Sequence, residues 1–220
     1  MRAKLFLFFL LSHSIHTNAQ DNLYGDSLVI EICNTIKKEP LNSDSATLAN
    51  ALLKNIKKPV NVQDSSFQQL VNYCIFRLQR QCPEFKVILD KVFPTKGDWA
   101  HISSAPKSSA SKKDCDEFFT IKQFKYFESD GNATNVIITT TGWTDYFKDG
   151  TTSQLSLKRE SDTTFVITFL KSDNESRKNF SKPGDQYKYT IIKRESSYYE
   201  MMVEAVGVDQ KMTFKLYYQL

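Results

Sequence analysis

The chain is poor in histidine and glycine, and it has no Gly-rich phosphate loop. It contains three histidines and seven glycines in 220 residues. His13 and His16 lie in an N-terminal leader, which leaves His101, in a polar stretch, as the histidine available for chemistry. Ser–His–Asp, Cys–His and His-based metal sites therefore have no support in the sequence. These absences predict a protein that is not an enzyme, with no catalytic residue, metal ligand or cofactor.

Long apolar segments are also scarce, and the longest one stands at the N-terminus. Arg2 and Lys4 open the chain, residues 5–11 are apolar, and the small residue Ala19 precedes Gln20. This pattern predicts a signal peptide over residues 1–19, cleaved near Ala19/Gln20. The apolar run is too short to span a bilayer, and no later segment is a better candidate. We expect an exported protein, either periplasmic or extracellular, with no transmembrane segment.

Basic character is weak once the leader is set aside. The formal charge of +4 includes Arg2 and Lys4, so the remaining chain carries +2. No dense basic run interleaved with aromatic residues remains, and nucleic acid is therefore not an expected partner.

All four cysteines follow the predicted leader, at Cys33, Cys74, Cys82 and Cys115. An even number of cysteines in an exported chain favours disulfides. Cys74 and Cys82 share one predicted helix, roughly 12 Å apart, too far to be bridged. Cys33 is expected to pair with Cys74 or Cys82, and Cys115 with the one left over. The alternative is that some of these cysteines stay reduced as small buried residues.

The first part of the chain, residues 20–94, is predicted to be a helical domain of three or four short helices. Apolar residues recur there at three- and four-residue spacing, and helix-capping residues and prolines divide the pattern. Such a small core is marginal alone, so a disulfide through Cys33 would stabilise it. The predicted helices start at Asp26–Ser27, at residues 43–45, at Asp64–Ser65 and, as a break or restart, at Pro83, and prolines at 40, 59 and 94 stop them.

Residues 95–114 interrupt this pattern. They are small, polar and basic, which is typical of a flexible linker.

The rest of the chain, residues 115–220, alternates apolar and polar residues, as strands with one buried face do. The alternation is clearest at the end, where Met212, Phe214, Leu216, Tyr218 and Leu220 are apolar. Asp149–Gly150 predicts a hairpin turn. Seven strands are expected, over residues 118–127 (bulged), 135–141, 153–159, 163–171, 187–191, 199–205 and 211–220, with a polar loop at 172–185.

The predicted fold class is therefore α+β. A helical bundle precedes an antiparallel β meander, closed as a small lipocalin-like barrel or folded as a sandwich. Large residues such as Phe165, Phe169, Met201 and Phe214 favour a filled core over a ligand cavity.

Several of these segments carry a resemblance to a known group of proteins. They are Cys115–Phe119, residues 122–126, Val136–Ile138, residues 161–168 and the last strands. They resemble uncharacterised secreted proteins of Bacteroidetes with a small lipocalin-like β domain. Members of that group often carry a second cysteine before the strand that begins here at Phe165, where this chain has threonines. The resemblance implies the barrel and no catalytic residues.

Aromatic residues offer the best indication of binding. Trp143 and Tyr146 stand at a strand end beside a turn, and Tyr198 and Tyr217 belong to tyrosine pairs whose members face opposite ways. Aromatic rings at a rim can stack on a sugar or hold a peptide. For Trp143 the competing interpretation is that it closes the end of the core.

Two functions remain open on these grounds. The first is a non-enzymatic binding module, whose β domain holds a small apolar ligand, a glycan or another exported protein. The second is a structural or envelope-associated protein that docks other exported proteins.

Overall fold

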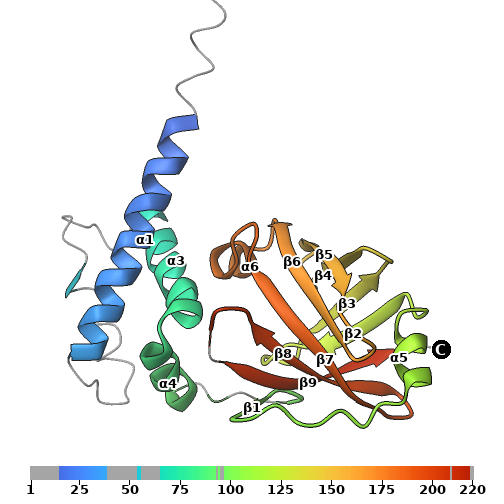
Figure 1. Cartoon of the computed structure of the whole chain (residues 1–220). Coiled ribbons are helices and arrows are strands. Elements are labelled where there is room, and N and C mark those ends of the chain that lie inside the picture. The colour runs from blue at the N-terminus through green and yellow to red at the C-terminus, as the bar shows by residue number, and fades with distance from the viewer. Residues whose placement is uncertain are drawn as a thin grey trace, which may run out of the picture. The chain divides into compact units, whose positions relative to one another are not determined.

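The computed structural model describes residues 15–38, 54–55, 65–92, 94, 97–208 and 210–218. They fall into two compact units, a helical unit that ends at Ile88 and a β unit that begins at Leu89 (Figure 1). The predicted α+β class is confirmed. Most of the expected signal peptide and of the helix expected from residue 43 lie outside the described residues.

Three helices are described in the N-terminal part, namely α1 (Ile15–Lys38), α3 (Ser65–Gln81) and α4 (Pro83–Val92). The predicted starts at Ser65 and Pro83 are confirmed. Pro83 suits a first helical position because the N–H that it lacks has no partner in the first turn. The predicted start at Asp26–Ser27 is wrong, because the polar residues before it contain no proline and continue the helix back to Ile15.

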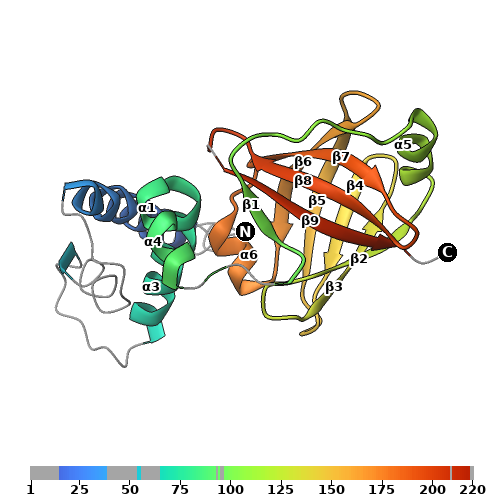
Figure 2. The same ribbon diagram turned by 90° about the horizontal axis from the view of Figure 1, so that it is seen from below.

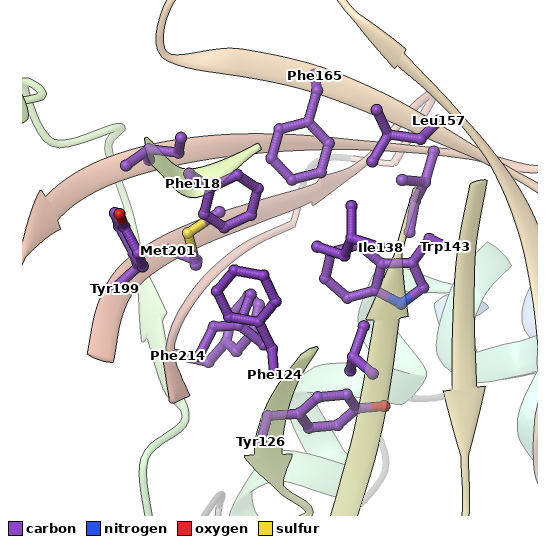
Figure 3. Close-up of a cluster of buried hydrophobic side chains, with 14 of the residues drawn as sticks. Phe118, Phe124, Tyr126, Ile138, Trp143, Leu157, Phe165, Tyr199, Met201 and Phe214 are labelled. Atoms are coloured by element: carbon purple, nitrogen blue, oxygen red, sulfur yellow. The ribbon is translucent and has the colours of Figure 1, made fainter. Parts of the chain in front are cut away.

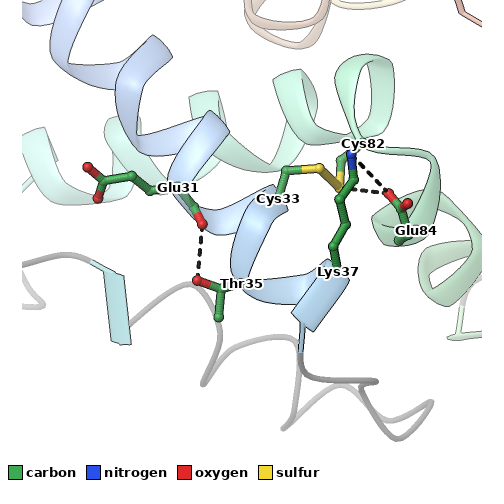
Figure 4. The surroundings of a disulfide bond; sticks show 6 residues. All are labelled: Glu31, Cys33, Thr35, Lys37, Cys82 and Glu84. Atoms are coloured by element: carbon green, nitrogen blue, oxygen red, sulfur yellow. Dashed lines mark hydrogen bonds and ion pairs between the residues drawn. A yellow bond between two sulfur atoms is a disulfide. The ribbon is translucent and has the colours of Figure 1, made fainter.

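A disulfide joins Cys33 on α1 to Cys82, which lies between α3 and α4 (Figure 4). Their Cα atoms are 5.6 Å apart, and the pair closes a loop of 49 residues. One of the two predicted partners of Cys33 is thereby confirmed. The expected bridge from Cys115 is wrong, because Cys115 is a free thiol with no exposed surface in the core of the β unit. Cys74 is likewise free and buried.

The β unit is an antiparallel barrel in which, within the described residues, eight strands close on themselves (Figure 2). Each strand from β2 to β9 pairs with the next, and β9 pairs with both β8 and β2. The strands are β2 (Gln123–Phe127), β3 (Ala133–Ile138), β4 (Gly142–Tyr146), β5 (Thr152–Arg159), β6 (Thr164–Ser172), β7 (Gln186–Arg194), β8 (Tyr198–Ala205) and β9 (Lys211–Tyr218).

The expected linker belongs largely to the β unit, which corrects the prediction for residues 97–114. Strand β1 (Ala100–Ile102) pairs with β9, and the amides of Ser109 and Ala110 both donate to the carbonyl of Ile192. Small polar residues suit this role because their backbone can run close against a strand. Residues 97–114 have the composition of a linker, but their structure comes from pairing with strands that are distant in the sequence.

The predicted bulged strand over 118–127 begins instead as a helix, α5 (Lys112–Phe118). Ser111 and Asp114 form a reciprocal capping box, in which the side chain of each accepts from the backbone N–H of the other. A capping box stabilises the start of a helix. The switch of the apolar positions from one face to the other within residues 118–127 therefore marks the end of this helix and the start of a strand.

Two further elements depart from the prediction. Strand β4 lies where only a strand end was expected, because its inward residues are Trp143 and the polar Asp145, which hide the alternation. The expected polar loop contains α6 (Glu175–Phe180), whose start is capped by the side chain of Asn174. The Asp149–Gly150 turn between β4 and β5 is confirmed, and Gly150 adopts a φ of 84° that favours glycine.

The interior of the barrel is filled with side chains, as predicted. Rings from many strands meet in it, including Phe165, Tyr199 and Phe214, together with Phe118 from α5 (Figure 3). Helices α5 and α6 lie at opposite ends of the barrel (Figure 1 and Figure 2). The ring of Phe118 on α5 contacts the rings of Phe124, Phe165 and Tyr199, with centroids 5.0 to 5.5 Å apart. This end is therefore apolar.

Candidate binding surface

The four predicted binding residues divide between the inside and the outside of the barrel. Trp143 is 2% exposed, and its ring lies 5.4 Å from that of Tyr189 and 6.2 Å from that of Phe165. It therefore belongs to the core and is not available to a ligand. Tyr146, Tyr198 and Tyr217 point outward, as their positions in the burial pattern of their strands show.

Near the α6 end the interior becomes polar. Trp143 Nε1 donates a 2.8 Å hydrogen bond to Oδ1 of Asp145, which is itself buried. Burial raises the pKa of Asp145 to about 6, against the opposing effects of Arg177 and of the indole hydrogen bond. A carboxylate taken out of water favours its neutral form, which explains the direction.

Arg177 of α6 supplies the positive charge at this end. Its guanidinium forms an ion pair with Glu128, lies 3.4 Å from the hydroxyl of Tyr126 and covers the ring of Phe147. Burial lowers the pKa of Arg177, but the surrounding Tyr126, Glu128 and Asp145 outweigh that effect and hold it above its ordinary value. The cluster ties α6 to the barrel.

The outward residues show a more regular arrangement. Strand register places Tyr198 opposite Tyr217, Tyr217 opposite Lys125, Lys125 opposite Asn135, and Asn135 opposite Tyr146. Directly paired residues point to the same face of a sheet, so these five form one row across the outer wall. We call them the outer row. Three of the four predicted binding residues thus come together on five adjacent strands.

The outer row has an aromatic group at each end. The rings of Tyr198 and Tyr217 lie 5.5 Å apart, and the hydroxyl of Tyr217 donates to Asp98 at 2.9 Å. Three strand spacings of about 4.8 Å place Tyr146 roughly 14 Å from Tyr217. Lys125 and Asn135 lie between the two aromatic ends.

A hollow of about 350 Å³ lies over the part of the row that ends at Tyr146. It is lined by Lys125, Asn135 and Tyr146 and by two residues of the next row, Gln123 and Ile137. Its volume falls at the lower end of the roughly 300–1,000 Å³ of small-molecule sites. The hollow combines an aromatic ring that is 42% exposed, an aliphatic side chain, two amides and an ammonium group.

The polar side chains of this hollow are free to bind. Gln123, Asn135 and Tyr146 make no side-chain hydrogen bond within the described part of the chain, and Lys125 contacts the Phe127 ring, 5.6 Å from its centroid. Elsewhere on the barrel polar groups are mostly paired, for example Lys193 with Glu195 and Glu200. The arrangement can hydrogen-bond a polar ligand while the ring of Tyr146 covers one face of it.

Other predicted features are placed elsewhere. His101 lies on β1, where its Nε2 is 3.2 Å from Oδ2 of Asp90. In the described residues, Cys33, Cys82 and Glu84 are close enough to share a metal ion. Because the two sulfurs form the disulfide, they are not available as thiolate ligands there.

Sequence reasoning missed Lys125, Asn135, Gln123 and Ile137. Each is an ordinary outward residue of a predicted strand, and only strand register brings them beside Tyr146. Alternation can indicate which residues face outward, but it does not reveal which residues are opposite each other.

A scan against protein-family models finds no match for the chain, and a search of curated proteins finds none either. No helix in the described part of the chain combines the length and apolar character that crossing a bilayer requires.

Proposed function

We propose that this is an exported, non-enzymatic binding module that holds a saccharide on the outer row of its β barrel. One observation carries the proposal. The ring of Tyr146 borders a hollow on the outer row, and the amide and ammonium groups of this hollow have no hydrogen-bond or ion-pair partner in the described chain. Sugar rings have apolar faces that stack on aromatic side chains and hydroxyl groups that bond to amides.

The filled interior favours the outer wall over a site inside the barrel. An eight-stranded barrel can be filled by side chains or can hold one small ligand. Here Phe165, Tyr199, Met201 and Leu216 have no exposed surface, and aromatic rings meet across the centre. A small apolar ligand would have to displace them, whereas a saccharide on the wall displaces water alone.

Export of the protein is part of the same proposal. The apolar leader at residues 5–11 and the Cys33–Cys82 disulfide both fit an oxidising compartment outside the cytoplasm. We also propose that the protein is related to the secreted lipocalin-like proteins that its strand segments resemble.

A glycan microarray probed with the intact protein tests this function. We expect binding to a subset of oligosaccharides, and a loss of about tenfold or more in affinity for Tyr146→Ala, by analogy with nucleic-acid bases, whose stacking on one aromatic ring contributes roughly 1–3 kcal/mol. Leu170→Ala, an equally exposed truncation on β6, serves as the matched control and should bind normally.

Mass spectrometry of the bound oligosaccharide after long incubation tests the absence of catalysis. An intact ligand is expected, and a shortened one would mean that the protein is an enzyme. Binding that is unchanged in Tyr146→Ala, or no glycan bound at all, would contradict the outer row as the site. A protein that copurifies instead would support the envelope-docking alternative.

A further inference from the structure

The outer wall formed by β2 to β5 has an unusual charge composition. The outward residues of these strands include amides, hydroxyls and lysines, and none of them is an aspartate or glutamate. They are Gln123, Lys125, Phe127, Ala133, Asn135, Ile137, Thr144, Tyr146, Thr152, Gln154, Ser156 and Lys158.

Strands β7 to β9 differ. On β7 to β9 the lysines are matched by carboxylates, as in the pairs Lys188–Glu160, Lys193–Glu200 and Lys211–Glu204. Lys125 and Lys158 form no ion pair within the described residues. The β2 to β5 wall, which carries Lys125, Asn135 and Tyr146 of the outer row, therefore has lysines that no carboxylate of the described residues pairs with.

Lys125 occupies a central place on this wall. It lies in the row between Tyr217 and Asn135, and the ring of Phe127 holds its ammonium group against the surface. An ammonium group has three N–H donors, and no acceptor in the described part of the chain uses them. Two strand spacings of about 4.8 Å separate it from Tyr146, so one ligand can reach both.

Backbone pairing excludes one way of recognising a peptide. Strand β3 pairs with β2 and β4, and β2 pairs with β3 and β9, so the strands beneath the row have no free edge along it. A peptide could not add to the sheet there as an extra strand. A ligand that binds through ring faces, hydroxyls and an acidic group fits this wall better.

We propose that the saccharide is acidic, and that a carboxylate on one of its sugars binds Lys125 while neighbouring rings lie on Tyr146 and Tyr217. This inference rests on the function proposed above and names its ligand class. It predicts a binding affinity that falls with salt, because the charge pair is exposed to solvent.

Titration calorimetry with two matched ligands tests the proposal. One is an oligogalacturonate and the other is the same oligomer with its carboxyl groups reduced to alcohols. We expect the intact protein to bind the acidic oligomer about tenfold more tightly, as a charge-assisted hydrogen bond would provide. Lys125→Gln should remove that preference, and Lys125→Arg should keep most of it.

Lys158→Gln is the control, since Lys158 is another unpaired lysine on the same wall. It stands six residues along β5 from Thr152, which pairs with Tyr146, or about 20 Å from the row. The Lys158→Gln variant should prefer the acidic oligomer as strongly as the unchanged protein does. Equal binding of the two oligomers would overturn the acidic class and leave the saccharide function standing. An unchanged preference in Lys125→Gln would overturn the role of Lys125. If the protein bound neither of these oligomers and no glycan on the microarray, both proposals would be overturned.

Discussion

The indole Nε1 of Trp143 donates its hydrogen bond to a buried carboxylate, Asp145, two residues further along the same strand. Because residues two apart on a strand share a face, both side chains point into the barrel. Arg177, Glu128, Tyr126 and Tyr189 are the charged and titratable groups that face Asp145. Two carboxylates thus stand near one guanidinium, and burial of Asp145 away from water is the main reason that its protonated form is favoured.

Asp145→Asn should stabilise the β unit at neutral pH. The pKa of Asp145 is about 6 in the folded protein, above the ordinary value of 3.8, so folding disfavours the ionised form. The stability that the protonated Asp145 contributes is fully present below pH 4 and is lost as pH rises through 6. The difference in unfolding free energy between the variant and the unchanged protein should grow over this window to roughly 2–3 kcal/mol. Urea unfolding followed by tryptophan fluorescence between pH 4 and pH 8 measures it.

Asp130→Asn is the control for the titration. Asp130 is exposed, and hydrogen bonds from the backbone and side chain of Asn132 lower its pKa. Its effect should have the opposite pH dependence, with the ionised form stabilising the fold above pH 4. The same slope in both variants would show that Asp145 does not titrate as described.

Replacing Arg177 should move the titration of Asp145. Arg177→Met keeps an unbranched apolar stem but removes the positive charge that lowers the pKa of Asp145. The midpoint should then rise by about 1 unit or more above 6. The indole N–H resonance of Trp143 reports it directly, with Trp99 as an internal reference. Arg159→Met, which removes an arginine bound to Asp116 and Asp162 instead, should leave the midpoint unchanged.

The fold was largely predictable from the sequence where local pattern and burial agree. In β9, Phe214, Leu216 and Tyr218 are buried and alternate with half-buried residues, as the pattern indicated. In β4 the pattern failed because Asp145, a polar residue, faces inward. The segment around Trp99 failed for another reason, since its structure comes from contacts with strands more than 25 residues away.

The cysteines and the binding residues show the same limit. Helix geometry correctly excluded a bridge between Cys74 and Cys82, but both offered plausible partners to Cys33, because the choice depends on how α1 lies against α3. Likewise, composition drew attention to Tyr146 and Tyr217, but Lys125 and Asn135 became part of the row through register alone.

Loss of the disulfide should destabilise the helical unit and spare the barrel. A closed loop of 49 residues corresponds to about 4 kcal/mol in the chain-entropy account. Both tryptophans, Trp99 and Trp143, belong to the β unit, so their fluorescence follows the barrel, while circular dichroism at 222 nm is dominated by helices. A reducing agent should lower the urea midpoint that circular dichroism reports and leave the midpoint that tryptophan fluorescence reports unchanged.

The double variant Cys33→Ser/Cys82→Ser provides the control, because a reducing agent should no longer change either transition. Non-reducing peptide mapping should recover the Cys33–Cys82 pair, with Cys74 and Cys115 modified by alkylating agents after unfolding. Burial raises the pKa of the Cys74 thiol to about 12 and that of Cys115 above its ordinary value, which slows reaction in the folded state. Rapid alkylation of Cys115 in the folded protein would contradict its place in the core.

Trp99→Ala should open the seam between β2 and β9. In the described residues these strands pair at two positions, and beyond them the Trp99 ring stacks on Phe214 at 4.5 Å while its Nε1 donates to the carbonyl of Phe127 at 2.6 Å. Loss of a large packed side chain should cost the β unit about 3 kcal/mol. Hydrogen exchange should accelerate at the backbone amides of β9 and β2.

The same substitution links the seam to the proposed function. The outer row crosses the seam where Tyr217 pairs with Lys125, so a loosened seam should also weaken saccharide binding. Trp99→Phe keeps an aromatic ring on Phe214 but loses the indole hydrogen bond, and it should cost only about 1 kcal/mol. If exchange in β9 and binding are unchanged in Trp99→Ala, then the β2–β9 pairing closes the barrel without Trp99. The segment before β1 would then be a tether after all.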